Sequence, residues 1–298
     1  MACDARAPEA RAPEALVNIV LAQLAVDLAE PKGARVKRVC DLLAGLPGLP
    51  GPAGQAGLVV LPEMWPTGYH AFDRYEAEAE PLDGPTATAL GEAALAMGAW
   101  LHAGSMVERD AAGSGPAGPG PALYNTSLLF GPDGTLVHTQ RKVHLFGHES
   151  RETDLLRPAT GVGVYRAPFA GLGLATCYDL RFPELFRVMV DAGAELLLVA
   201  AAWPAARLDH WRLLARARAV ENQCFVAACN TAGTQAGVEL GGHSLVVDPW
   251  GVVVAEAGDG EEMLAVDVDL ARVAAVRAEL PVLADRRLAV PPTLGPGR

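Results

Sequence analysis

One segment of the sequence, GLGLATCYDLRFPEL at residues 171–185, constrains the fold more than any other. Its apolar first half predicts a strand, and its second half predicts the start of a helix. Cys177 therefore lies on the turn between the two elements. Because the amides and the dipole at a helix start stabilise a thiolate, we expect the pKa of Cys177 to lie below the value of about 8.5 for free cysteine.

The other four cysteines have plainer explanations. Free cysteine is among the most buried residue types. Cys40 falls in an amphipathic helical pattern, whereas Cys224 and Cys229 fall in the strand-like run CFVAAC, where an odd separation places them on opposite faces. Cys3 lies in a tail rich in alanine, proline and charge. Neither a zinc site nor a short-range disulfide is indicated, so we expect free thiols.

Two ionisable residues follow predicted strands elsewhere in the chain. Glu63 comes after LVVLP, where Pro62 ends strand pairing and lets the carboxylate face a cleft. Lys142 stands in TQRKVHLFG and is one of only three lysines, against 21 arginines. A compact ammonium fits beside a thiolate or an oxyanion where a planar guanidinium does not. Considered alone, each of these two residues could equally be a charged side chain exposed to solvent at the surface.

Together, the segments around Glu63, Lys142 and Cys177 resemble the nitrilase superfamily of carbon–nitrogen hydrolases, in which Glu, Lys and Cys occur in this order. Later segments (AAWPAARLDHW, RARAVENQCFVAACN and GGHSLVVDPWGVVVAEA) are also similar to family segments, so the resemblance spans about residues 16–287. The sequences of these motifs are most similar to those of the omega-amidase branch, whose members remove the terminal amide of 2-oxo acids such as 2-oxoglutaramate. The resemblance implies an α/β fold, a four-layer α-β-β-α sandwich of mixed sheets with outer helices. It also implies a homodimer or larger homo-oligomer, without metal or organic cofactor.

The family has a second glutamate between the lysine and the cysteine, followed by a hydrophobic pair and a proline. Glu152 in ETDLLRP fits this pattern, and the nearby Glu149 is the alternative. The resemblance implies that Glu152 orients Lys142 and the substrate nitrogen.

These residue types suit the hydrolysis of an amide. An amide carbonyl is a poor electrophile, so a thiolate nucleophile divides the reaction into acylation and deacylation through a thioester. The resemblance implies that Glu63 is the base in both halves. Lys142 and the backbone N–H of Tyr178 are then the donors to the tetrahedral oxyanion.

A substrate that carries a carboxylate needs a cationic partner. Arg207 in the WPAAR segment is our candidate, because a guanidinium binds a carboxylate through two hydrogen bonds. Arg181 is the second candidate, but we expect it to form a salt bridge with Asp179 or Glu184 instead.

Composition favours an enzyme over a nucleic-acid-binding module. At 298 residues with 51% hydrophobic types, the chain can bury a large core. A net charge of −11 disfavours nucleic acid or an anionic membrane as a partner. The first apolar stretch, LVNIVLAQLAV, is too short to span a bilayer, and the acidic tail before it does not resemble a secretory signal, so we expect a cytoplasmic protein.

We expect one domain over residues 16–287, preceded by a disordered tail at 1–15 and followed by a tail at 288–298. Helical patterns fall at residues 33–46, 85–98 and 270–280. Residues 111–121 are expected to be a flexible connection, and SLLFGPDGTLVHTQ is expected to be a hairpin.

Other motifs carry little weight. GLGLAT lacks the third glycine of a dinucleotide fingerprint, and the chain has neither a phosphate-binding loop nor a G-x-S-x-G elbow. His144 and His148 have the spacing of a helical metal site, but Gly147 between them disfavours a helix. We expect His144 to pack or hydrogen-bond beside Lys142, and Asp179 to cap the following helix.

Two functional classes are left. The first is a cysteine amidohydrolase, with omega-amidase activity preferred over N-carbamoyl amino acid amidohydrolase, deaminated-glutathione amidase and nitrilase activities. The second is an inactive relative that serves as a scaffold, which the intact Glu63, Lys142 and Cys177 disfavour.

Overall fold

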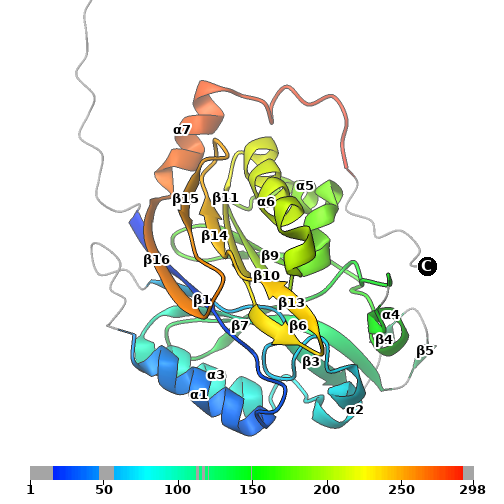
Figure 1. Ribbon diagram of the computed structural model, residues 1–298. Coiled ribbons are helices and arrows are strands. Elements are labelled where there is room, and N and C mark those ends of the chain that lie inside the picture. Colours follow the sequence, from blue (N-terminus) through cyan, green and yellow to red (C-terminus); the bar gives the residue numbers. More distant parts are fainter. Residues whose placement is uncertain are drawn as a thin grey trace, which may run out of the picture.

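Two six-stranded sheets form the centre of the computed structural model, which describes residues 16–46, 57–111, 114–115, 118–119, 121–148 and 150–290 (Figure 1). The first sheet has the order β16 (Glu262–Asp269), β1 (Leu16–Gln23), β2 (Leu58–Val60), β3 (Trp100–Asp110), β6 (Ala122–Phe130) and β7 (Leu136–Arg141). The second has the order β15 (Val253–Glu256), β14 (Leu245–Val247), β11 (Phe225–Asn230), β10 (Leu196–Ala201), β9 (Gly171–Thr176) and β8 (Val164–Arg166). The expected tail at 1–15, most of the tail at 288–298 and Glu149 lie outside the described residues.

Helices cover the outer face of each sheet (Figure 1). The first sheet packs against α1 (Lys32–Ala44) and α3 (Pro85–Met97), and the second packs against α5 (Pro183–Asp191) and α6 (Leu208–Asn222). Helix α7 (Ala271–Glu279) contributes Val273 to the core between the sheets. The expected four-layer α-β-β-α sandwich is therefore confirmed.

Shorter elements fill the connections. They are the helical turns η3 (Phe72–Arg74), α2 (Tyr75–Glu78), α4 (Glu152–Leu155), η4 (Cys177–Arg181) and η5 (Ala205–Arg207), and the two-stranded ribbons β12 (Ala232–Gln235) with β13 (Val238–Gly241) and β4 (Ser114–Gly115) with β5 (Gly118–Pro119). The ribbon β4–β5 lies in the segment expected to be a flexible connection, so that expectation was incomplete.

Strand side chains alternate between two apolar layers. In β1, Ile19 and Leu21 point into the core between the sheets, whereas Val20 and Ala22 pack with α1 and α3. A strand buried on both faces needs apolar residues at every position, which explains the unbroken apolar runs in this sequence. The same alternation puts Cys224 and Cys229 in different cores, as expected from their odd separation, and both are free thiols.

The expected secondary structure is confirmed where the patterns were long. The three helical patterns correspond to α1, α3 and α7, and the hairpin corresponds to β6 and β7, which pair antiparallel. Among the described residues, no helix combines the length and the apolarity that a bilayer crossing requires.

The sheets bring strand ends together. Strands β1, β2 and β3 are parallel neighbours in one sheet, and β9, β10 and β11 are parallel neighbours in the other. The backbone N–H of Glu63, just beyond β2, donates to the carbonyl oxygen of Ala201 at the end of β10, 3.3 Å away. Within the first sheet, Gly104 of β3 lets the chain after β2 pass close by, because a Cβ there would lie 1.9 Å from the carbonyl oxygen of Pro62. The carboxyl ends of strands from both sheets therefore meet at one place, where side chains can form a site.

Candidate active site

Glu63 is held by three donors from different elements. Its Oε1 accepts from Lys142 Nζ at 2.9 Å and from Asn125 Nδ2 at 2.8 Å, and its Oε2 accepts from the backbone N–H of Ala202 at 3.0 Å. The Glu63 side chain is fully buried. These contacts fix the carboxylate beside the end of β10.

Lys142 follows the last residue of β7 and is also fully buried. Its Nζ donates to Glu63 and to both carboxylate oxygens of Glu152, at 2.8 and 3.0 Å. Glu152 additionally accepts from the hydroxyl of Tyr69 at 3.1 Å and from the backbone N–H of Phe146 at 2.8 Å. The structure thus joins Glu63, Lys142 and Glu152 in one buried cluster.

Cys177 lies at the end of β9 in a left-handed backbone conformation, with φ of +48°. The helix expected directly after it is instead the five-residue 3₁₀ turn η4, and the α-helix α5 begins only at Pro183. Asp179 forms a capping box with Thr176 on η4 itself, whereas α5, the α-helix that follows, has no side-chain cap, so the expected cap lies on the turn and not on the following helix. A non-glycine residue with positive φ is uncommon and is typical of sites where function imposes the backbone geometry.

The expected depression of the Cys177 pKa is wrong. Burial and the adjacent Glu63 carboxylate raise the pKa of Cys177 well above its usual value, and the opposing effect of Lys142 does not compensate. The physical reason is that a single 3₁₀ turn supplies little of the dipole that a longer helix would, whereas removal of a thiolate from water is costly. The resting side chain of Cys177 is therefore a thiol.

With both carboxylates ionised and the lysine protonated, the buried cluster carries one net negative charge. Burial lowers the pKa of Lys142, but the carboxylates of Glu152 and Glu63 outweigh this effect and raise that pKa well above its usual value. The lysine is therefore charged. Burial raises the pKa of Glu152, and Lys142 opposes that change. Transfer of the Cys177 proton to Glu63 would leave the total charge unchanged, whereas loss of that proton to solvent would add a second buried negative charge. The charge balance thus favours proton transfer within the cluster over loss of the proton to solvent.

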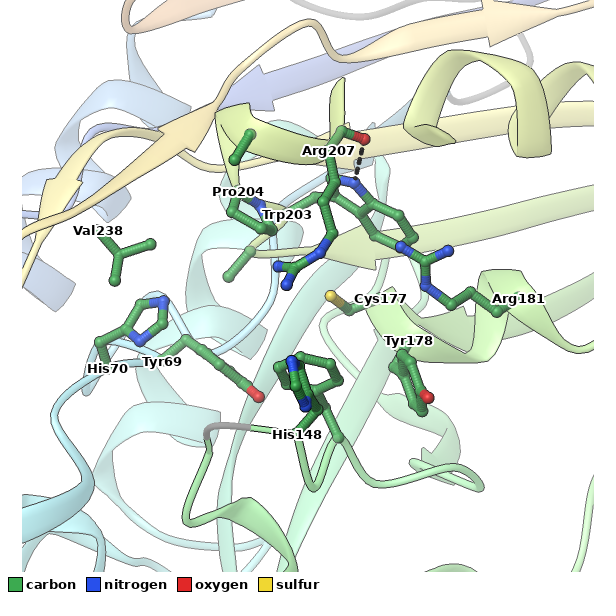
Figure 2. Close-up of a pocket in the computed structure, with 13 residues that line it drawn as sticks. Tyr69, His70, His148, Cys177, Tyr178, Arg181, Trp203, Pro204, Arg207 and Val238 are labelled. Carbon is green, nitrogen blue, oxygen red and sulfur yellow. Dashed lines mark hydrogen bonds between the residues drawn. The ribbon is translucent and has the colours of Figure 1, made fainter. Parts of the chain in front are cut away.

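Cys177 opens into a cavity of about 240 Å³. Arg181 and Arg207 approach its sulfur from two sides, and Tyr178 also lines the space (Figure 2). Among the described residues, none of those lining the cavity is Asp or Glu. Neither arginine has an ion-pair partner in the part of the chain that the structure describes, so the cavity is cationic beyond the cysteine.

The salt bridge expected for Arg181 is not formed with the described Asp179 or Glu184. The Arg181 guanidinium lies over the ring of Trp203, 4.6 Å from its centroid, and 3.4 Å from Nδ1 of His210. Asp179 is occupied by donors from Thr176 and His144. Arg181 therefore faces the cavity together with Arg207.

Sequence reasoning missed two side chains of the buried cluster. Tyr69 bonds to Glu152, and Asn125 donates to both Glu63 and Glu152, at 2.8 and 3.3 Å. Asn125 stands in the buried strand β6, where the three successive polar residues 125–127 between apolar ones are the signal that could have identified it. Tyr69 is the last residue of the segment that contains Glu63, but its position in the sequence does not show that its side chain points toward Glu152.

The histidine pair lies on a loop between β7 and α4, not on a helix. His144 bonds through Nδ1 to Asp179, 2.8 Å away, and stacks on Phe182. Over the described residues, no group of three or more His, Cys, Asp and Glu side chains is placed to hold a metal ion.

The pH profile of Cys177 alkylation tests this charge arrangement. The midpoint for reaction with iodoacetamide should lie above that of free cysteine, because burial and Glu63 raise the pKa of the thiol. Glu63→Gln removes the carboxylate and should move the midpoint to lower pH. Mass spectrometry of the Cys177 peptide gives the rate at each pH.

Glu184→Gln is the control for this measurement, because it changes an exposed carboxylate in the first turn of α5. Its midpoint should equal that of the native protein. A midpoint in Glu63→Gln that is unchanged, or that moves to higher pH, would contradict the arrangement.

Comparison with known proteins agrees with this geometry. The family model for carbon-nitrogen hydrolases matches residues 23–278. A 2-oxoglutaramate amidase of Paenarthrobacter nicotinovorans is 38% identical over 275 residues, which cover 91% of this chain and 90% of that protein. The crystal structure of Saccharomyces cerevisiae Nit3, a member of branch 10 of the nitrilase superfamily, superposes with a TM-score of 0.78 at 32% identity, covering 92% of this chain and 97% of that one.

A second similar structure is that of an amidase from Nesterenkonia sp. AN1, with a TM-score of 0.73 and 26% identity over 91% of this chain and 94% of that one. In it, a variant carries the acetamide moiety of fluoroacetamide covalently added at the active-site cysteine. The family match and the high identity over most of the chain show that this protein belongs to the carbon-nitrogen hydrolase family of the nitrilase superfamily and hydrolyses amide carbon–nitrogen bonds.

Proposed function

We propose that the protein is an omega-amidase that releases ammonia from the terminal amide of a small 2-oxo acid such as 2-oxoglutaramate. One observation carries this proposal: the Cys177 sulfur opens into a small cavity lined by two arginines and, among the described residues, by no carboxylate. Such a cavity favours a substrate that brings its own carboxylate. The identity with a 2-oxoglutaramate amidase over most of both chains supports the same substrate class.

Acylation begins when the Cys177 sulfur attacks the amide carbon. Glu63 takes the thiol proton as the carbon–sulfur bond forms, so the buried cluster keeps its net charge. The carbonyl oxygen becomes an oxyanion, which the Lys142 ammonium and the backbone N–H of Tyr178 stabilise. The carbon–nitrogen bond then breaks, and Glu63 returns the proton to the departing nitrogen, which leaves as ammonia. The product of this half is a thioester on Cys177.

Deacylation uses the same base. Glu63 takes a proton from a water molecule that attacks the thioester carbon, and the carbon–sulfur bond breaks to release the carboxylic acid. Glu63 then returns the proton to the sulfur. Glu152 holds the Lys142 ammonium through both carboxylate oxygens, so the oxyanion donor does not need to reorganise. The covalent addition of an acetamide moiety to the active-site cysteine of the Nesterenkonia amidase supports a nucleophilic role for Cys177.

We assign the substrate carboxylate to Arg207. The guanidinium of Arg181 is already stacked on Trp203, and burial together with the nearby Arg207 lowers the pKa of Arg181. Two like charges this close repel one another, and a bound carboxylate would relieve that repulsion. Arg207 projects toward the sulfur and forms no ion pair with any described residue (Figure 2).

The direct test is ammonia release from 2-oxoglutaramate, from an N-carbamoyl amino acid and from a simple nitrile. We expect turnover of the 2-oxo acid amide and little or none of the other two. The nitrile has no carboxylate for the arginines to bind, and the similarity to a 2-oxoglutaramate amidase favours the oxo-acid amide over the N-carbamoyl amino acid, which is also an acid. Cys177→Ala should lose at least about 10³-fold in kcat, since the nucleophile itself is removed. Turnover of one of the other two compounds alone would overturn the proposed specificity, and undiminished turnover in Cys177→Ala would overturn the role of Cys177.

Arg207→Ala tests the carboxylate assignment. A hydrogen bond to a charged group contributes about 1.5–3 kcal/mol, so kcat/KM for 2-oxoglutaramate should fall about 10- to 150-fold. The same variant should hydrolyse a neutral amide such as butyramide within about twofold of the native rate, since that substrate has no carboxylate to bind. Equal losses on both substrates would instead show that Arg207 supports the cavity without recognising the acid.

A further inference from the structure

The backbone that carries the nucleophile is strained. Cys177 has a φ of +48°, and a non-glycine residue in this region costs about 1–3 kcal/mol. Such a conformation persists only where surrounding contacts hold it. The contacts around Cys177 therefore decide where its sulfur points.

Asp179 makes three of these contacts through a buried carboxylate. Its Oδ2 accepts from the backbone N–H of Thr176 at 3.0 Å, directly before Cys177. Its Oδ1 accepts from the backbone N–H and from Nδ1 of His144, both at 2.8 Å. The Asp179 side chain is only 2% exposed, so these bonds are formed away from water and cannot be replaced by solvent.

The bonded partners belong to different sheets. Cys177 follows β9 of the second sheet, whereas His144 lies two residues after Lys142, which follows β7 of the first. Ring contacts join the same two segments, because His144 stacks on Phe182 with ring centroids 3.7 Å apart. Phe146 meets Tyr178 edge to face at 5.0 Å, while its backbone N–H donates to Glu152.

We propose that Asp179 is a positioning residue that fastens the cysteine turn to the loop after Lys142, and thereby fixes the sulfur relative to the ammonium. The inference rests on the proposed function, in which Cys177 attacks while Lys142 stabilises the oxyanion. Asp179 touches neither the substrate nor the reacting atoms. Its effect is on geometry, and an error of about 1 Å in a reacting group can cost on the order of 100-fold in rate.

Asp179→Asn tests this role with little change in size. Asparagine replaces one acceptor oxygen by an N–H group, which must face the donor of Thr176 or of His144. We expect kcat to fall about 10- to 100-fold while KM changes by less than about threefold. The rate of Cys177 alkylation by iodoacetamide should fall in parallel.

Asp248→Asn is the matched control. Asp248 is also buried, and it accepts from the backbone N–H groups of Trp250 and Val252 at 2.9 and 3.0 Å and pairs with Arg272 at 2.9 Å. It does not line the cavity. Both variants should lower the free energy of unfolding, but Asp248→Asn should keep the native kcat and alkylation rate per folded molecule.

A second pair of variants isolates the imidazole bond, should Asp179→Asn fail to fold. His144→Asn places a side-chain N–H near the position of Nδ1, whereas His144→Leu cannot donate, and both lose the stacking on Phe182. The asparagine variant should retain an alkylation rate about 2- to 12-fold higher than the leucine variant, as expected for one hydrogen bond.

Two outcomes would overturn the inference. One is a loss of kcat in Asp179→Asn that the fraction of folded protein fully explains, as measured beside Asp248→Asn. The other is equal alkylation of His144→Asn and His144→Leu. Alkylation needs no substrate, so these results are distinguishable from a failure of the 2-oxoglutaramate assignment.

Discussion

The structure depends on a buried ion cluster, Lys142 between Glu63 and Glu152. A single charge buried without a partner would cost several kcal/mol, so each member requires the others. Lys142 donates to both carboxylates, and Tyr69 and Asn125 satisfy further oxygens. With both carboxylates ionised, one negative charge is left over, and burial together with the Glu63 carboxylate raises the pKa of the nearby cysteine. In the proposed mechanism Glu63 accepts the thiol proton, so the carboxylate that disfavours the thiolate at rest is also the base that forms it during the reaction.

The four-layer architecture determines which groups can meet. Glu63 and Lys142 follow strands of the first sheet, whereas Cys177 and Ala202 follow strands of the second. The apolar core between the two sheets sets the distance between the sheets. Hydrogen bonds between the strand ends of the two sheets then fix the positions of these side chains relative to one another. The N–H of Ala202 on Glu63 is one such link, and the Asp179 bonds are another. An enzyme built across two sheets needs these links because neither sheet contains the whole reaction centre.

Much of the site could be predicted from sequence, because Glu63, Lys142 and Cys177 each follow an apolar strand and the family resemblance joins them. Glu152 could be predicted from the residues after it. The shift in the pKa of Cys177 could not be predicted from the sequence, because the direction of that shift depends on how deeply the turn is buried and on how close the Glu63 carboxylate lies. The absence of a salt bridge between Arg181 and Asp179 could not be predicted either, because Asp179 is instead hydrogen-bonded to a loop more than 30 residues earlier in the chain.

The central claim is that this cluster drives covalent attack by Cys177 on an amide. Single-turnover reaction with 2-oxoglutaramate, quenched in acid and followed by peptide mass spectrometry, tests it most directly. We expect a transient adduct on the Cys177 peptide, with the mass of the substrate less ammonia, and no adduct or turnover in Cys177→Ala. Ammonia release with the acyl group on a different residue, or turnover that persists in Cys177→Ala, would contradict the account.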